Sequence, residues 1–156
     1  MESVRNRIRF LSSRAGFTVI EMLIVVVILG IAATFATPAV SRFIRHDRVN
    51  RAATIVVADL QNVFAVAGRQ RAPVRLTADN TNRTYTITDR KTGTVIRTRD
   101  FGSTSEYSLT ALVLNPTTID VFPSGVSSAA LTATITNGDY SRTVTASTAG
   151  FVRITP

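Results

Sequence analysis

The sequence predicts an α+β protein in which one long N-terminal helix precedes a small antiparallel β-sheet domain. Residues 17–36 form an apolar block with a single charged residue, and a stripe of apolar residues then continues to residue 67 at steps of three and four. After Pro73 the pattern changes to alternating segments rich in threonine, valine and isoleucine. A helical period followed by a separate block of strand period is typical of the α+β class.

The helix is expected to begin with a membrane-spanning part. Residues 1–16 form a basic leader with four arginines and one glutamate, and Glu21 is the only charged residue of the apolar block that follows. Twenty helical residues at 1.5 Å each span about 30 Å, which is the thickness of the hydrocarbon core of a bilayer. We therefore predict a transmembrane part at about residues 17–37.

The second part of the helix is expected to be amphipathic. Pro38 can kink a helix, and the apolar pattern resumes directly after it. The predicted stripe comprises Val40, Phe43, Ile44, Val49, Ala52, Ala53, Val56, Leu60, Val63, Phe64 and Ala67. Gly68 is a suitable C-cap, and Pro73 stands beyond it. The predicted helix thus covers residues 17–68.

A β-rich globular domain is predicted over residues 69–156. The expected strands are 74–78, 83–89, 94–99, 107–114, 118–122, 131–136, 142–146 and 151–154. The clearest hairpin joins "LTATIT" to "SRTVTAS" around "NGDY", because Asn-Gly favours a tight turn between strands. We expect an antiparallel sheet that buries the helix stripe from Val49 to Ala67.

Composition excludes several kinds of chemistry. The 156 residues include no cysteine and one histidine, His46, so thiolate chemistry, zinc sites and Ser-His-Asp triads have no basis. His46 is expected to face solvent or lipid headgroups. The sequence predicts no enzyme, no cofactor and no metal site. The net charge is +8, and 17 of the 18 basic residues are arginine. Such a charge attracts nucleic acid or anionic lipid, although arginines scattered along a chain also serve solubility.

Three interpretations compete for the N-terminal segment. A secretory signal peptide has a shorter apolar region and a small-residue cleavage site, which is poorly represented here. A plain single-pass anchor explains the length but not Glu21. A carboxylate at the centre of a membrane helix costs roughly 2.5 to 3.5 kcal/mol. An interpretation that accounts for Glu21 must therefore include an interaction of this carboxylate that offsets the cost.

The segment "GFTVIEMLIVVVILGIAA" closely resembles the class III signal of type IV pilins and pseudopilins. The resemblance implies that a prepilin peptidase cleaves after Gly16 and methylates the new N-terminus at Phe17. It further implies that Glu21 pairs with the terminal amine of a neighbouring subunit during assembly, and that Pro38 is the kink of a pilin-like helix. A buried carboxylate that is costly alone becomes tolerable once it is paired.

The C-terminal third resembles, more weakly, the end of GspH/FimT-type minor pilins and pseudopilins. The resemblance is carried by "IDVFPSGVSS" and "TAGFVRI". Some members of this type bind DNA through arginines near this end, and only Arg142 and Arg153 could provide such polyanion contacts here. The plainer alternative is that Gly125 and Gly150 are turn residues and that Phe122 and Phe151 belong to the core.

These resemblances imply a non-catalytic structural subunit, either a minor pilin of a type IV pilus or a type II secretion pseudopilin. The expected partners are other pilin or pseudopilin subunits, the prepilin peptidase, the assembly platform of the inner membrane and membrane lipid. The expected location is the inner membrane, in a single pass, with the C-terminal domain in the periplasm or outside. Arginines flank the apolar block on both sides, so the topology follows from the motif rather than from charge. A DNA-binding minor pilin and an anchored domain that does not polymerise are the alternatives.

Overall fold

The computed structural model describes residues 16–155, except that the side chains of residues 35–38 are not described. The predicted leader therefore lies outside the described residues, apart from Gly16. The chain forms two compact units, one ending at Ala39 and one beginning at Val40, and each is described by itself.

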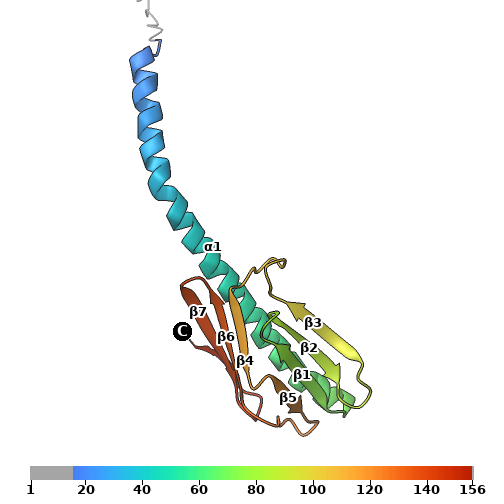
Figure 1. Ribbon diagram of the computed structural model, residues 1–156. Helices are drawn as coiled ribbons and strands as arrows, with labels where there is room; N and C mark the ends of the chain where they lie inside the picture. The colour runs from blue at the N-terminus through green and yellow to red at the C-terminus, as the bar shows by residue number, and fades with distance from the viewer. Residues whose placement is uncertain (1–15, 156) are drawn as a thin grey trace, which may run out of the picture. The chain divides into compact units, whose positions relative to one another are not determined.

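One helix, α1, runs from Val19 to Gln70 and contributes to both units (Figure 1). It continues two residues past Gly68, so the predicted C-cap at that glycine is wrong. Arg71 follows the last helical residue with a φ of 50°, the left-handed conformation that commonly ends a helix. The backbone stays helical through Pro38, and the kink expected there remains a prediction.

In the first unit, the helix is long and apolar enough to cross a membrane, judged by its length and composition. Its side chains from Val19 to Thr34 are all exposed, so this stretch buries none of its apolar surface within the described chain. An unburied apolar helix of this length requires a lipid or protein environment.

The second unit contains eight strands in addition to its part of α1. These are β1 Val74–Asp79, β2 Thr84–Asp89, β3 Val95–Asp100, β4 Ala111–Asn115, β5 Thr118–Val121, β6 Leu131–Asn137, β7 Tyr140–Ala146 and β8 Val152–Thr155. Each predicted strand has a counterpart. The fourth begins later than expected, because residues around Ser108, whose φ is 43°, form an irregular turn before β4.

The strands form two four-stranded antiparallel sheets, with the orders β3-β2-β1-β5 and β4-β6-β7-β8. Figure 1 shows β4, β6 and β7 of one sheet on the left and the lower part of α1 behind β1 and β2 of the other sheet. The predicted hairpin around "NGDY" joins β6 to β7, with Asn137 paired to Tyr140 and a loop of two residues between them. The predicted α+β class is confirmed, whereas the division into two sheets was not predicted.

A single core joins α1 to both sheets. The helix supplies Val49, Ala52, Ala53, Val56, Leu60, Val63, Val66 and Ala67. The buried face predicted for Val49 to Ala67 is therefore confirmed, with Phe64 half-buried at its edge. Val40, Phe43 and Ile44, which begin the same stripe, are exposed, because the apolar core shared with the sheets starts at Val49.

Candidate assembly site

The start of α1 is closed by two reciprocal hydrogen bonds between Thr18 and Glu21. The backbone N–H of Glu21 donates to Oγ1 of Thr18 at 3.2 Å, and the N–H of Thr18 lies 3.5 Å from Oε2 of Glu21. Thr18 immediately precedes the first helical residue, so the pair forms a capping box. The N–H of Thr18, which has no partner within the helix, gains one in this way, and the N–H of Glu21, which also donates to the carbonyl of Thr18 at 3.1 Å, gains a second.

The capping box gives Glu21 a role within its own chain that the sequence interpretation missed. The signal was present, because a threonine followed three residues later by glutamate before an apolar run is the sequence signature of this motif. The carboxylate is also favourably placed near the positive end of the helix dipole.

The residues predicted for peptidase recognition lie directly before this cap. Gly16 has an open surrounding, with no atom within 4 Å of the position that a Cβ would occupy. Phe17 is 75% exposed. The Glu21 carboxylate reaches the amide of Thr18, which is the residue next to Phe17. The structure therefore brings the predicted cleavage position and the predicted assembly carboxylate to the same helix end.

The second unit contains a buried carboxylate, Asp59, that the sequence did not single out. Oδ2 of Asp59 accepts hydrogen bonds from the Tyr85 hydroxyl at 2.8 Å and from Nε of Arg99 at 2.7 Å. Oδ1 accepts a bond from Nη1 of Arg97 at 3.0 Å. Only 4% of the Asp59 side chain is exposed. The cluster ties α1 to β2 and β3, which are far from it in sequence.

The pKa values in this cluster follow from burial and charge. Burial raises the pKa of Asp59, but the hydrogen bonds from Arg99 and Tyr85 and the charges of Arg99 and Arg97 outweigh burial, so the pKa lies below its usual value. Burial, reinforced by the neighbouring carboxylate, raises the pKa of Tyr85 far above its usual value. The tyrosine therefore stays a neutral donor, and the aspartate stays ionised.

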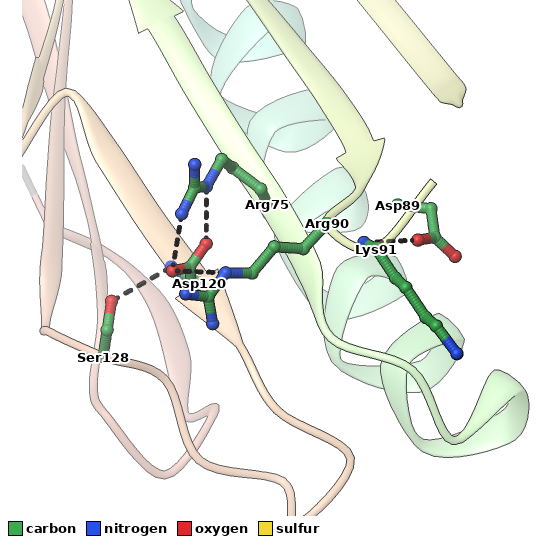
Figure 2. Close-up of polar contacts among 6 residues, drawn as sticks. All are labelled: Arg75, Asp89, Arg90, Lys91, Asp120 and Ser128. Carbon is green, nitrogen blue, oxygen red and sulfur yellow. Dashed lines mark hydrogen bonds and ion pairs between the residues drawn. The ribbon is translucent and has the colours of Figure 1, made fainter. Parts of the chain in front are cut away.

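A second carboxylate, Asp120 on β5, pairs with two arginines (Figure 2). Arg75 on β1 donates to it through Nε at 2.7 Å and Nη2 at 3.0 Å, and Nε of Arg90 lies 3.4 Å away. The backbone N–H of Asp120 donates to the Ser128 hydroxyl at 3.0 Å. Bonding to Arg75 is the main cause that lowers the pKa of Asp120. Neither cluster contains the histidine or paired free carboxylates that acid–base chemistry uses.

The predicted polyanion residues Arg142 and Arg153 are not brought together. Nε of Arg142 donates to Oδ1 of Asn50 on α1 at 3.3 Å, so Arg142 faces the helix. Arg153 pairs with Thr145 across β7 and β8, and its Nε lies 3.4 Å from the Thr145 hydroxyl. Residues 142 and 145 of one strand point to opposite faces of the sheet. The two arginines therefore lie on different faces.

His46 does not simply face solvent or headgroups, as had been expected. Its ring stacks on Tyr140, with centroids 3.8 Å apart and an interplanar angle of 14°. The contact fixes the β6–β7 turn to the helix. Arg45 reaches the same turn, with Nε 3.8 Å from Oδ1 of Asp139.

In the C-terminal third, the two glycines expected in turns meet that expectation, but one of the two phenylalanines expected in the core does not. Gly125 and Gly150 have φ values of 80° and 79°, which confirms that they are turn residues. Phe122 is half-buried, and Phe151 is 72% exposed, so the expectation that Phe151 belongs to the core is wrong. The close contact in this region is made by Gly150, which packs against the ring of Phe64.

Among residues 16–155, no group of three or more histidine, cysteine, aspartate or glutamate side chains is placed to hold a metal ion.

Comparisons with known proteins point in the same direction. Residues 11–37 match the family model described as the prokaryotic N-terminal methylation motif. The fold is similar to two crystal forms of the Pseudomonas aeruginosa type IV minor pilin FimU. The first has 21% identity, a TM-score of 0.58 and coverage of 73% of this chain and 92% of that chain. The second has 19% identity and a TM-score of 0.55, covering 69% and 92%.

A further similar structure is the minor pseudopilin EpsH of the type 2 secretion system of Vibrio cholerae. It has 16% identity and a TM-score of 0.55, with 69% of this chain and 96% of that chain covered. A comparison with curated protein sequences finds no match. The chain thus joins an N-terminal methylation motif to a pilin-like α+β fold that is similar to those of a minor pilin and a minor pseudopilin.

Proposed function

We propose that this protein is a non-catalytic structural subunit of a type IV pilus or a type II secretion pseudopilus. The observation that supports this proposal is the start of the helix. Gly16 and Phe17 precede an apolar helix that has the capped Glu21 in its first turn, and its side chains are all exposed through Thr34. A subunit that passes from lipid into a helical bundle needs such a surface, because its apolar side chains then exchange one apolar partner for another.

Maturation would begin with cleavage after Gly16, followed by methylation of the new amine of Phe17. This step places a positive charge one residue before Thr18, whose amide the Glu21 carboxylate already approaches. The partners of this step are the prepilin peptidase and the assembly platform of the inner membrane, and other pilin or pseudopilin subunits follow. The second unit would face the periplasm or the exterior and form the surface of the filament.

In this proposal Glu21 has two roles that can be separated. It caps its own helix through its hydrogen bond, and it attracts the terminal amine of a neighbouring subunit through its charge. Glutamine at the same capping-box position retains the hydrogen bond but carries no charge. Thr18→Ala removes the hydroxyl half of the cap and leaves the charge. The variants therefore distinguish assembly from local helix capping.

The experiment measures incorporation of each variant into sheared filaments, with the amount in the membrane fraction as the reference. We expect Glu21→Gln and Glu21→Ala to abolish incorporation while membrane levels persist, and Thr18→Ala to reduce incorporation only modestly. Wild-type incorporation of both Glu21 variants would refute the role of the charge. Absence of the wild-type protein from filaments would favour an anchored domain that does not polymerise.

A further inference from the structure

A short segment of α1 carries three arginines directly after the expected transmembrane part. We name it the juxtamembrane arginine segment and define it as residues 40–48, with Arg42, Arg45 and Arg48 at steps of three. The segment begins three residues after position 37, where the transmembrane part is expected to end. A chain that leaves the hydrocarbon core must pass through the layer of lipid headgroups, so the segment begins in that layer whatever the angle of the helix.

Two of the three arginines have no acidic partner. Arg42 is exposed and Arg48 is half-buried, and neither makes an ion pair in the part of the chain that the structure describes. The acidic residue of the segment, Asp47, is instead paired with Arg51 one turn further along the helix. The charges of Arg42 and Arg48 therefore remain available to an anion outside this chain.

The third arginine, Arg45, is held by the β6–β7 turn but is only weakly neutralised there. The turn packs on the stem of this side chain, because a Cβ at Gly138 would lie 3.2 Å from Cδ of Arg45. Its Nε lies 3.8 Å from Oδ1 of Asp139, whose side chain is 82% exposed. An exposed pair at such a distance contributes little. Three arginines thus face one loosely held carboxylate.

The same segment exposes apolar side chains. Val40, Phe43 and Ile44 lie outside the core, and 74% of Phe43 is exposed. Their spacing of three and four residues places them on one stripe of the helix. Apolar side chains and arginines in one helical segment are typical of a membrane interface, where the apolar groups enter the boundary of the acyl chains and the cations stay among the headgroups.

The direction of the helix favours contact between these arginines and lipid phosphates. Side chains on an α-helix point back toward its N-terminus. In α1 the expected transmembrane part lies N-terminal to the segment, so the long arginine side chains extend along the helix toward that part. A guanidinium also pairs with a phosphate through two parallel hydrogen bonds, a geometry that suits a headgroup.

A second copy of the chain and a soluble anion fit this segment less well. A second copy inserted in the same bilayer places its own three arginines at the same depth, so the two segments repel each other. A soluble anion would meet the arginines but would leave Phe43 and its apolar neighbours in water. Anionic phospholipid provides a negative headgroup and an acyl chain within one molecule.

We propose that the juxtamembrane arginine segment binds anionic phospholipid in preference to zwitterionic phospholipid. Arg42 and Arg48 contact the negative headgroups, and Phe43 packs at the boundary of the acyl chains. Extraction of the subunit from the bilayer then requires that these contacts be broken. The inference rests on the membrane insertion that belongs to the proposed function, but not on cleavage, methylation or filament assembly.

The test uses the fluorescence of a single introduced tryptophan, because the chain contains none of its own. Ile31→Trp places this reporter at an exposed position six residues before the end of the expected transmembrane part. The full chain is reconstituted in equal mixtures of phosphatidylglycerol and phosphatidylcholine, in which one lipid or the other carries brominated acyl chains. Bromine quenches a neighbouring tryptophan, so the ratio of the two quenching efficiencies gives the relative affinity for the anionic lipid.

Two variants are compared in this background. Arg42→Gln/Arg48→Gln removes the two arginines of the segment that make no ion pair. The matched control, Arg69→Gln/Arg71→Gln, removes two exposed arginines that also make no ion pair within residues 16–155. The control arginines lie where α1 ends, and Arg69 is about 32 Å along the helix from Arg48 at 1.5 Å per residue. Circular dichroism confirms that both variants are folded.

We expect the reporter chain to prefer phosphatidylglycerol about fivefold at low salt, since an arginine near an anionic surface contributes on the order of fivefold. The preference should fall below about twofold in the segment variant and stay near its original value in the control. Equal quenching by the two lipids would overturn the proposal and favour a second copy as the occupant, and an equal loss in both variants would also overturn it. Quenching by neither lipid would show that the helix is outside the bilayer, which would refute the proposed function as well.

Discussion

Nε of Arg99 on β3 donates a 2.7 Å hydrogen bond to the Asp59 carboxylate on α1, and the two residues are 40 positions apart in the chain. β3 is an edge strand whose residues are otherwise exposed or nearly so. β3 contributes no buried apolar side chain, and Arg97 and Arg99 tie it to the helix through three hydrogen bonds to Asp59.

Asp59→Asn should therefore destabilise the second unit by about 2 to 3 kcal/mol. Removing one partner of a buried ion pair leaves the other charges uncompensated, and the cost is reduced here because the side chains of Arg97 and Arg99 are 41% and 33% exposed. The measurement is the urea dependence of unfolding of the full chain in detergent. Amide hydrogen exchange should show the largest loss of protection in β3.

Asp139→Asn is the matched control for that substitution. Asp139 also pairs with an arginine, but 82% of its side chain is exposed and the distance to Arg45 is 3.8 Å. An exposed pair of this kind contributes less than about 0.5 kcal/mol. A loss of stability as large as that of Asp59→Asn would show that the burial of Asp59 is not what matters.

The same ion pairs predict that acid destabilises the protein. Native Asp59 and Asp120 both have a lowered pKa, so they bind protons less readily in the folded chain than in the unfolded chain. Their stabilisation is fully present above the unfolded pKa of about 3.9 and is lost as the pH falls through the lower native values. The free energy of unfolding should be constant from pH 7 to about pH 5 and should decline below about pH 4.

Comparison of the wild type with Asp59→Asn at pH 7 and at pH 3 isolates the contribution of the Asp59 carboxylate to stability. The difference between their unfolding free energies should be largest at pH 7 and should shrink at pH 3. A difference that stays constant across this range would mean that the ionised carboxylate does not cause it.

Gly150→Ala should lower the unfolding free energy of the second unit by more than the positive φ of this turn position explains. Its Cβ would lie 2.9 Å from Cδ1 of Phe64, and its φ of 79° is unfavourable for any side chain. Gly125 has nearly the same φ of 80° but open space around its Cβ position. We expect about 1 kcal/mol of destabilisation for Gly125→Ala and about 2 to 4 kcal/mol for Gly150→Ala in thermal unfolding. Equal costs would mean that the contact with Phe64 relaxes freely.

The elements with a strong local pattern could be predicted from the sequence. The buried helix face from Val49 to Ala67 and all eight strands follow from spacing and alternation. Val40, Phe43 and Ile44 continue the same period, yet they are exposed, because periodicity does not indicate how far along the helix the sheets extend. The division into two sheets likewise depends on pairing between distant strands.

The polar contacts were harder to predict, for two different reasons. The pairing of Asp59 with Arg97 and Arg99 depends on tertiary structure, and nothing local marks Asp59 as special. The Thr18–Glu21 capping box, in contrast, has a local signature that was overlooked because Glu21 was considered only as a charge in an apolar helix. Arg142 and Arg153 were named together because the family resemblance implies polyanion contacts near this end of the chain, although strand alternation places them on opposite faces.

The central proposal, that the chain is processed as a prepilin, is tested most directly by mass spectrometry of the N-terminus of the mature protein. The protein should be purified from the membranes of cells with an active prepilin peptidase, with a Gly16→Val variant as the control. We predict that the wild-type chain begins at N-methylated Phe17 and that the variant retains the leader. A wild-type chain that still begins at Met1 would contradict the proposal.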